Sequence, residues 1–254
     1  MLISRKYPRT HHYKWSPGTT SDDRINHEWW GDMSKIENVI HTEKMDGEGT
    51  CLNSVGVFAR SHATPTKHPW ADYLKVKHSM IVDDLRRTDT EIFGENLYAV
   101  HSILYPKIEN HFYVFGVRVL DKWLSWEEVK FISSIYDLPT VPEFGVVKPK
   151  ELGEETFVNQ VLDIVKNPST FDSIQNGINK PCTMEGVVSR NIEEYHVDDF
   201  SNNLIKYVRK DHVKTDKHWS SSIKRAPLQS EVLSFMRDKQ LSYDEAFLLL
   251  VNKK

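Results

Sequence analysis

The stretch Thr42-Glu43-Lys44-Met45-Asp46-Gly47-Glu48-Gly49-Thr50-Cys51-Leu52 decides how the rest of the sequence is interpreted. An apolar run ends just before it and a strand-like run begins at Thr50, so the pattern predicts a tight turn between two strands. The turn carries Lys44 followed by Asp46 and Gly47, and glycines allow backbone N–H groups to approach a ligand closely. A partly buried amine near other cations has a lowered pKa and can act as a nucleophile. A hairpin turn with a solvated lysine is the simpler alternative, and the motif alone leaves it open.

The composition is that of an ordinary globular protein. Hydrophobic residues make up 39% of the 254 residues, charged residues make up 27%, and the formal net charge is −3. A nucleic-acid partner would therefore have to be bound by a local basic cluster. Two cysteines are too few for a disulfide framework and indicate a reducing compartment. No signal peptide and no apolar run of the roughly 18–20 residues of a membrane span is evident. We therefore expect a cytosolic protein, or a viral one in the host cytosol, with no membrane contact and no evident protein partner.

Hydrophobic periodicity predicts a mixture of strands and helices after an irregular start. Residues 1–35 are rich in His, Pro, Trp and charged residues, and they indicate little regular structure. Strands are expected around the lysine turn within residues 36–60, and then over 90–98, 111–120, 184–190 and 204–209. Helices are expected over 70–87, from Ser125 onward, and over 155–165, 228–239 and 243–251. Ser125 with Glu128, and Ser242 with Glu245, have the spacing of a capping box.

Five short motifs follow one another along the predicted strands. They are Lys44-Met45-Asp46-Gly47, Phe93-Gly94-Glu95, Phe112-Tyr113-Val114-Phe115-Gly116, Glu185-Gly186-Val187-Val188 and Leu204-Ile205-Lys206. In their order and residue types they resemble the covalent nucleotidyltransferase superfamily, which contains ATP-dependent RNA and DNA ligases and mRNA-capping enzymes. The resemblance spans roughly residues 36–210, which is most of the chain.

Phage and bacterial RNA ligases are the group within this superfamily that the sequence resembles most. Glu43 before the lysine and the run Phe93-Gly94-Glu95-Asn96-Leu97-Tyr98-Ala99-Val100-His101-Ser102-Ile103 look like stretches of that group. DNA ligases and capping enzymes usually carry an arginine five residues after the lysine, where this chain has Gly49.

The resemblance implies a fold of the α+β class. We expect a nucleotidyltransferase (adenylation) domain over residues 1–220, with antiparallel sheets, flanking helices and the nucleotide in the groove between the sheets. Residues 221–254 would add a short helical extension, which is too small for the OB domain of DNA ligases and capping enzymes.

The resemblance also assigns roles to the residues of the lysine turn. Lys44 would attack the α-phosphorus of ATP, and Glu43 would bind the adenine amino group. Asp46 would orient Lys44 or a metal-bound water, and Gly47 would keep the turn open. An Asp-Gly turn with no ligand is the alternative for the last two residues.

Four further residues would contact the nucleotide. Arg60, at the end of a predicted strand, would lie near the ribose and the leaving phosphates, because a planar guanidinium suits phosphate oxygens. Glu95 would accept hydrogen bonds from the ribose hydroxyls. Phe115 would stack on adenine, although packing in the core is an alternative because strand residues alternate between faces. Arg190 would contact the β- or γ-phosphate, with a solvated side chain as an equal alternative.

The remaining motif residues would act on the reacting phosphate. Glu185 would bind the divalent metal, because a carboxylate in an apolar strand is costly unless it is paired or metal-bound. Lys206 would contact the α-phosphate and stabilise the charge that grows there in the transition state. The family often has a second lysine two residues later, but this chain has Val208. Arg209 is expected to point to the opposite strand face from Lys206, so it would be a poor substitute for that second lysine.

The function implied is that of an ATP-dependent RNA ligase. Such an enzyme joins RNA 3′-OH and 5′-phosphate ends through a lysyl-AMP intermediate and an RNA-adenylate, with ATP and magnesium, or manganese in its place, as cofactors. The alternatives are a DNA ligase, a capping guanylyltransferase, or a catalytically silent nucleotide- or RNA-binding module.

A basic segment near the end of the chain is the candidate RNA surface. Residues 206–225 hold seven basic and two acidic side chains, and phosphate contacts are expected from Lys210, Lys214, Lys217 and Lys224. A solvated charged loop is the alternative. A second possible RNA surface is the basic and aromatic start of the chain, from Arg5 to Lys14.

Overall fold

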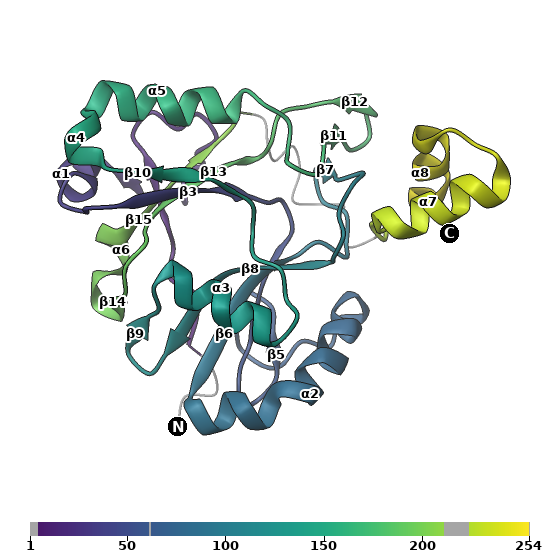
Figure 1. Cartoon of the computed structure of the whole chain (residues 1–254), viewed down its shortest axis with the longest axis horizontal. Coiled ribbons are helices and arrows are strands. Elements are labelled where there is room, and N and C mark those ends of the chain that lie inside the picture. Colours follow the sequence, from purple (N-terminus) through teal and green to yellow (C-terminus); the bar gives the residue numbers. More distant parts are fainter. Residues whose placement is uncertain (1–4, 61, 211–223, 254) are drawn as a thin grey trace.

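Two six-stranded β-sheets form the centre of the computed structural model, which describes residues 5–60, 62–210 and 224–253 (Figure 1). The first sheet has the strand order β10 (Glu143–Val147), β3 (Val39–Lys44), β13 (Gly186–Asn191), β15 (Leu204–Val208), β1 (His11–Tyr13) and β2 (Ile25–Asn26). The second has the order β14 (Tyr195–His196), β9 (Lys122–Trp123), β8 (Phe112–Val119), β6 (Thr90–Asn96), β4 (Glu48–Leu52) and β5 (Val57–Phe58). A small third sheet joins β12 (Lys180–Pro181), β11 (Ile174–Gln175) and β7 (Ile103–Leu104).

The lysine turn is the place where the chain passes from the first sheet to the second. Strand β3 ends at Lys44, and β4 begins at Glu48 in the other sheet. Gly47 makes this crossing possible, because a Cβ at its position would lie only 2.5 Å from the Asn96 carbonyl oxygen. The turn that follows Lys44 therefore lies where the two sheets meet.

The described residues form helices that flank the two large sheets, with the last two helices standing apart at one side of the molecule (Figure 1). They are α1 (Trp29–Met33), η1 (Pro69–Ala71), α2 (Asp72–Thr88), α3 (Trp126–Ile135), α4 (Pro149–Leu152), α5 (Glu154–Val165), η2 (Val197–Asp199), α6 (Phe200–Asn203), α7 (Gln229–Lys239) and α8 (Tyr243–Val251). On α5 the buried residues Phe157, Val161 and Val165 recur every four positions, so they lie on one face of the helix. That face packs against residues such as Val187 of the first sheet, while α2 and α3 pack on the second sheet.

The α+β class, the antiparallel sheets and the flanking helices predicted from the sequence are confirmed. The predicted strands and helices are present with shifts of a few residues at their ends, and both capping boxes, at Ser125 and Ser242, are formed. Strand β10 was not predicted, because most of its side chains are exposed and give no burial pattern.

The expectation of little regular structure in residues 1–35 was wrong. Strand β1 pairs in parallel with both β15 and β2, and α1 follows them. These elements are two to five residues long, which is too short for a hydrophobic period to show in the sequence. Tyr13 is fully buried in the first sheet's core, so at this position the aromatic start of the chain packs inward rather than toward a nucleic acid.

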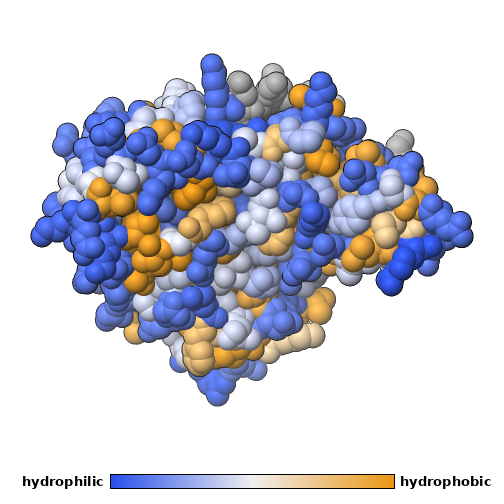
Figure 2. Space-filling model, turned by 45° about the horizontal axis from the view of Figure 1, so that its top comes forward, coloured by the Kyte–Doolittle hydropathy of each residue, from blue (hydrophilic) through white to orange (hydrophobic). Residues whose placement is uncertain are grey.

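The last two helices form a pair that stands out at one side of the molecule (Figures 1 and 2). The pair is anchored through the segment before it, where the backbone N–H of Ala226 donates to the Tyr98 carbonyl and that of Val100 donates to the Lys224 carbonyl. Val232 and Phe247 of the pair belong to the core cluster of the second sheet. Leu233 and Leu249 are exposed, so the pair presents apolar as well as hydrophilic residues, as Figure 2 shows. Among the described residues, no helix is both long enough and apolar enough to cross a membrane.

Candidate active site

Lys44 and Glu185 form a close ion pair at the edge of the first sheet. Lys44 ends β3, and Gly186 opposite it begins β13, so the residue just before Gly186 is brought beside the lysine. The Lys44 Nζ–Glu185 Oε1 distance is 2.5 Å. The Lys44 side chain is 24% exposed and that of Glu185 is 4% exposed, so the amine alone keeps access to solvent.

Lys206 lies on the same sheet face as Lys44. A row across the ladder pairs Thr42 with Val188 and Val188 with Lys206, and Thr42 is two residues before Lys44. Residues two apart on a strand point to the same side, so both amines face the second sheet. Lys206 forms no ion pair with another described residue. Lys44, Glu185 and Lys206, which belong to three separate sequence motifs, thus lie on neighbouring strands of one sheet.

The expected lowering of the nucleophile's pKa is not found at Lys44. Burial acts to lower the pKa of its amine, but the nearby carboxylates of Glu185, Glu95 and Asp46 outweigh burial, and the pKa is raised above its usual value. The lowering occurs instead at Lys206, where burial and the charge of Lys44 bring the pKa to about 8. Lys44 is thus held as an ammonium ion by Glu185.

Arg60 and Arg209 differ in their relation to this pair of lysines. Arg60 is exposed after β5, and its charge is one of those that lower the pKa of Lys206. Arg209 donates through Nη2 to Gln175 Oε1 at 2.7 Å, which turns it toward the third sheet. The doubt about Arg209 as a second cation beside Lys206 is therefore supported.

Asp46 is held by a segment to which the sequence gave no role. Its Oδ2 accepts hydrogen bonds from Ser102 Oγ and from the backbone N–H of Ile103, both at 2.7 Å. Its own backbone N–H donates to the Tyr105 hydroxyl, also at 2.7 Å. Asp46 thus fixes the turn that carries Lys44, and it acts on the amine through its charge. The only sequence signal for this contact was the His101-Ser102-Ile103 part of the motif that resembles RNA ligases. A hydrogen bond between two side chains produces no periodicity in the sequence, so the role of Ser102 could not be predicted.

Glu95 reaches the same turn from β6. Its Oε1 accepts a hydrogen bond of 3.0 Å from the backbone N–H of Gly47. Burial raises the pKa of Glu95 to about 8, against the opposing charge of Lys44 and with a further contribution from Glu185. The Glu95 carboxyl group is therefore easily protonated. A protonated carboxyl group can both accept and donate hydrogen bonds, which suits contact with ribose hydroxyls.

Replacing Glu95 with Gln should change how stability depends on pH. An unfolded glutamate has a pKa of about 4.3, whereas the folded value is about 8. Between these values the folded state keeps a proton that the unfolded state loses, so this group's contribution to stability falls as pH rises toward 8. The stability of Glu95→Gln relative to wild type should therefore increase from pH 5 to 8, by up to about 1 kcal/mol per pH unit, and then level off.

Urea unfolding at several pH values, followed by tryptophan fluorescence, measures this difference. The matched control is the exposed Glu109→Gln, which makes the same chemical change on the surface. A difference between Glu95→Gln and wild type that does not vary with pH would show that Glu95 does not retain its proton in the folded protein.

Glu43 lies on the face of β3 opposite Lys44. Its Oε2 accepts a hydrogen bond of 3.0 Å from the backbone N–H of Thr170, and its Oε1 is buried with no hydrogen-bond partner among the described residues. Burial raises the pKa of Glu43, with a further contribution from Glu185. An acceptor left without a donor is the feature that an amino group of a ligand would satisfy.

Phe115 and Arg190 are found together. The Phe115 ring is half-buried and meets Tyr7 edge-on, with 4.9 Å between ring centroids. Arg190 donates through Nη1 to the Phe115 carbonyl oxygen and is only 6% exposed. In the ladder Arg190 pairs with Ile40, four residues from Lys44, which is about 13 Å along the strand. On its other side Arg190 pairs with Leu204, two residues from Lys206, so along the sheet it lies nearer to Lys206 than to Lys44.

The described residues contain no group of three or more His, Cys, Asp or Glu side chains arranged to hold a metal ion. Glu185 provides oxygen donors beside the Lys44 amine. This donor fits a hard cation that takes its other ligands from phosphate oxygens and water, as magnesium does, rather than one that needs a complete protein cage.

The predicted RNA contacts fall in different places. Lys210 is exposed after β15, and Lys224 donates through Nζ to Asn252 Oδ1 at 2.8 Å. Lys214 and Lys217 lie outside the described residues.

Comparison with known proteins gives a family match and structural matches. The model of the family described as "RNA ligase" matches residues 37–208, which include every motif residue discussed above. No curated protein matches the chain in sequence.

The structural matches are to RNA ligase from Naegleria gruberi. An apo mutant of that enzyme has a TM-score of 0.53 with 14% sequence identity, covering 82% of this chain and 56% of its own. A mutant solved with ATP and Mn has a TM-score of 0.52 with 14% identity, covering 82% and 57%. The enzyme solved with PPi has a TM-score of 0.51 with 15% identity, covering 85% and 59%. The chain thus spans somewhat more than half the length of these proteins, and at this identity the likeness concerns the fold.

Proposed function

This chain belongs to the RNA ligase family, and from this premise we propose that it is an ATP-dependent RNA ligase that joins 3′-OH and 5′-phosphate ends. The observation that carries the proposal is the convergence of Lys44, Glu185 and Lys206 on one sheet face at the turn between the sheets. A binding module has no need of an accessible amine held against a buried carboxylate.

The reaction begins at the Lys44 amine. After it loses its proton, Nζ forms a bond to the α-phosphorus of ATP, the bond to the bridging oxygen breaks, and pyrophosphate leaves. The AMP group then moves to the RNA 5′-phosphate, and attack by the 3′-OH forms the new phosphodiester and releases AMP. Lys206, on the same sheet face, would stabilise the negative charge that grows on the α-phosphate.

The other residues would bind and orient the nucleotide. Glu43 Oε1 would accept the adenine amino group, Phe115 would stack on the base, and Glu95 would accept from the ribose. Arg60 would lie near the leaving phosphates. Magnesium bound at Glu185 would supply positive charge next to the α-phosphate, and the structures of the Naegleria relative with ATP and Mn support ATP and a divalent metal as cofactors.

Incubation with labelled nucleotide and magnesium tests the proposal. We expect a covalent label, stable to denaturation, from ATP and none from GTP. A label from GTP would indicate a capping guanylyltransferase. Binding of ATP without any label would indicate a silent nucleotide-binding module, and sealing of nicked DNA in preference to RNA would indicate a DNA ligase.

We propose that Lys210, Lys214, Lys217 and Lys224 contact the RNA phosphates. Replacing Lys214, Lys217 and Lys224 together with Ala should weaken RNA binding and flatten its dependence on salt, because fewer counterions are released. The measurement is a salt titration of RNA binding, with Lys–AMP formation expected to be nearly unchanged. The matched control replaces Lys75, Lys148 and Lys166, which lie on α2, just before α4 and just after α5, and each of which pairs with an acidic residue three positions away. Equal salt slopes for the first variant and wild type would place the RNA elsewhere.

We also propose the division into an adenylation domain over residues 1–220 and a helical extension over residues 221–254. An extension docked on the domain is supported by the hydrogen bonds that the Gln229 backbone N–H donates to the Ile108 carbonyl and the Tyr243 hydroxyl donates to the Pro106 carbonyl.

A further inference from the structure

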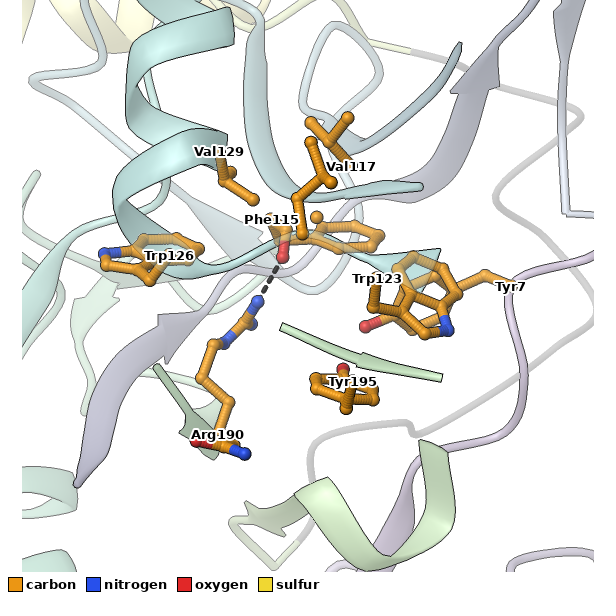
Figure 3. Close-up of a pocket in the computed structure, with 11 residues that line it drawn as sticks. Tyr7, Phe115, Val117, Trp123, Trp126, Val129, Arg190 and Tyr195 are labelled. Atoms are coloured by element: carbon orange, nitrogen blue, oxygen red, sulfur yellow. Dashed lines mark hydrogen bonds between the residues drawn. The ribbon is translucent and has the colours of Figure 1, made fainter. Parts of the chain in front are cut away.

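A bulge in β8 leaves Phe115 without an opposite residue in β6. The ladder pairs Phe93 with Gly116 and then Gly94 with Val114, so Phe115 is the extra residue. A bulge interrupts the ladder and redirects the side chain of the residue it inserts. The carbonyl oxygen of Phe115 accepts a hydrogen bond from Arg190 Nη1 (Figure 3).

This hydrogen bond joins the two large sheets. Phe115 belongs to β8 of the second sheet, and Arg190 belongs to β13 of the first. Figure 3 shows the Arg190 side chain extended toward the Phe115 carbonyl, with Trp126 on one side and Tyr195 on the other. The guanidinium carbon lies 4.9 Å from the centre of the Trp126 ring, which adds a cation–π contact.

Arg190 is buried without a compensating carboxylate. It is 6% exposed and forms no ion pair within the described residues, and its Nε has no hydrogen-bond partner among them. Beside it is a cavity of about 20 Å³, lined in part by Tyr7 and Tyr195, which has room for about one water molecule. Burying an unpaired charge is costly, so a chain that needed only a packed core here would do better with an apolar residue.

Arg190 therefore lies at the base end of the proposed nucleotide site. Val188, two residues earlier on the same strand face, is half-buried and packs against the same aromatic cluster as Phe115. A flat base between the sheets would be bounded by Phe115 from one sheet and Val188 from the other. Lys44, where the α-phosphate must lie, is four ladder positions from Arg190.

We propose that Arg190 is a positioning residue for adenine: its guanidinium holds the bulge at Phe115 and so sets the height and tilt of the ring on which the base stacks. This inference rests on the proposed function, because it assumes that ATP binds between the sheets. It replaces the expected contact between Arg190 and the β- or γ-phosphate.

Binding of three ligands that share the base but differ in phosphates separates the two roles. The ligands are adenosine, AMP and an ATP analogue with a methylene group between the α- and β-phosphates, which Lys44 cannot cleave. Isothermal titration calorimetry on wild type, Arg190→Met and Arg190→Lys gives the affinities. If Arg190 acts through Phe115, Arg190→Met should weaken all three ligands by the same factor, about 3- to 10-fold, since part of a stacking contact is lost. Arg190→Lys should lose less, because its ammonium can still donate to the carbonyl.

A contact with the outer phosphates predicts the opposite pattern. Adenosine and AMP affinities would then stay unchanged while that of the analogue falls, and this result would overturn the inference. Unchanged affinities for all three ligands would overturn it as well. Should Arg190→Met fail to fold, Arg190→Lys carries the same comparison.

A double-variant cycle tests whether Arg190 acts through the ring. In a Phe115→Leu background, replacing Arg190 with Lys should cause no further loss of adenosine affinity. Losses that simply add would show that Arg190 acts on the ligand independently of Phe115. A wild-type protein that binds none of the ligands would refute the nucleotide site itself, and the inference with it, whereas altered patterns on a binding wild type bear on Arg190 alone.

Discussion

Replacing Lys44 with alanine should abolish covalent attachment of AMP, lowering its rate by more than about 10³-fold, because the bond to the α-phosphorus is proposed to form at the Lys44 amine. Lys44→Ala should still seal an RNA strand that already carries AMP at its 5′ end, because that step needs no lysine adduct. Labelling with ATP measures the first effect, and ligation of adenylated RNA measures the second.

The ion pair with Glu185 makes a second variant necessary. Alanine leaves the buried Glu185 carboxylate without its partner, so Lys44→Ala should also lose stability. Lys44→Arg keeps a cation beside Glu185 but cannot become a neutral nucleophile near neutral pH. It should fold as well as wild type and be equally unable to form the adduct. Persistent labelling of either variant would remove Lys44 from the mechanism.

Replacing Glu185 with glutamine should slow AMP attachment by at least about 10²-fold, a loss comparable to removing one strong charge-stabilising group. Glutamine has nearly the same shape and can still accept a hydrogen bond from Lys44, so the fold should persist with a modest loss of stability. It cannot supply a carboxylate to a divalent cation, and the magnesium concentration needed for half-maximal rate should rise. A magnesium titration of the single-turnover rate gives both quantities.

Glu194→Gln is the matched control for this experiment. Glu194 forms a 2.6 Å pair with Lys122 on the surface, so this variant also breaks a lysine–glutamate pair and removes one negative charge. Its rate and magnesium dependence should match wild type. If Glu185→Gln mainly lowers the melting temperature and reacts normally while folded, the carboxylate is structural.

The parts of the site that could be predicted from the sequence are the residues at or near the ends of predicted strands. Lys44 and Glu185 belong to motifs whose order and strand-like surroundings are visible in the sequence, and adjacent strands bring such residues together by geometry alone. Their pKa shifts could not be predicted in the same way. The raised pKa of Lys44 depends on which charges surround one amine in space, and the carboxylates there outnumber the cations that the sequence suggested.

Other features depend on contacts that leave no trace in a linear pattern. The hydrogen bond from Ser102 to Asp46 joins residues 56 positions apart in the sequence, and neither residue type is unusual in a loop. The sequence suggested that Arg190 binds a phosphate. It could not show that the Arg190 guanidinium donates a hydrogen bond to the Phe115 carbonyl, because that carbonyl lies in a one-residue bulge 75 positions earlier. Strand β1 is three residues long, too short to be predicted from its own sequence, and it is recognised as a strand through its pairing with β15.

The pairing of β1 with β15 affects how the protein is made. His12 of β1 lies opposite Lys206 of β15, so the first sheet cannot be completed until residues 204–208 have left the ribosome. Until then β13 and β1 each lack a neighbour on one edge, and contacts of such high sequence separation form slowly. A nascent chain that stops before residue 208 would expose an open sheet edge, which is a substrate for aggregation and for quality-control proteases. During translation the first sheet thus stays incomplete until β15 has been made.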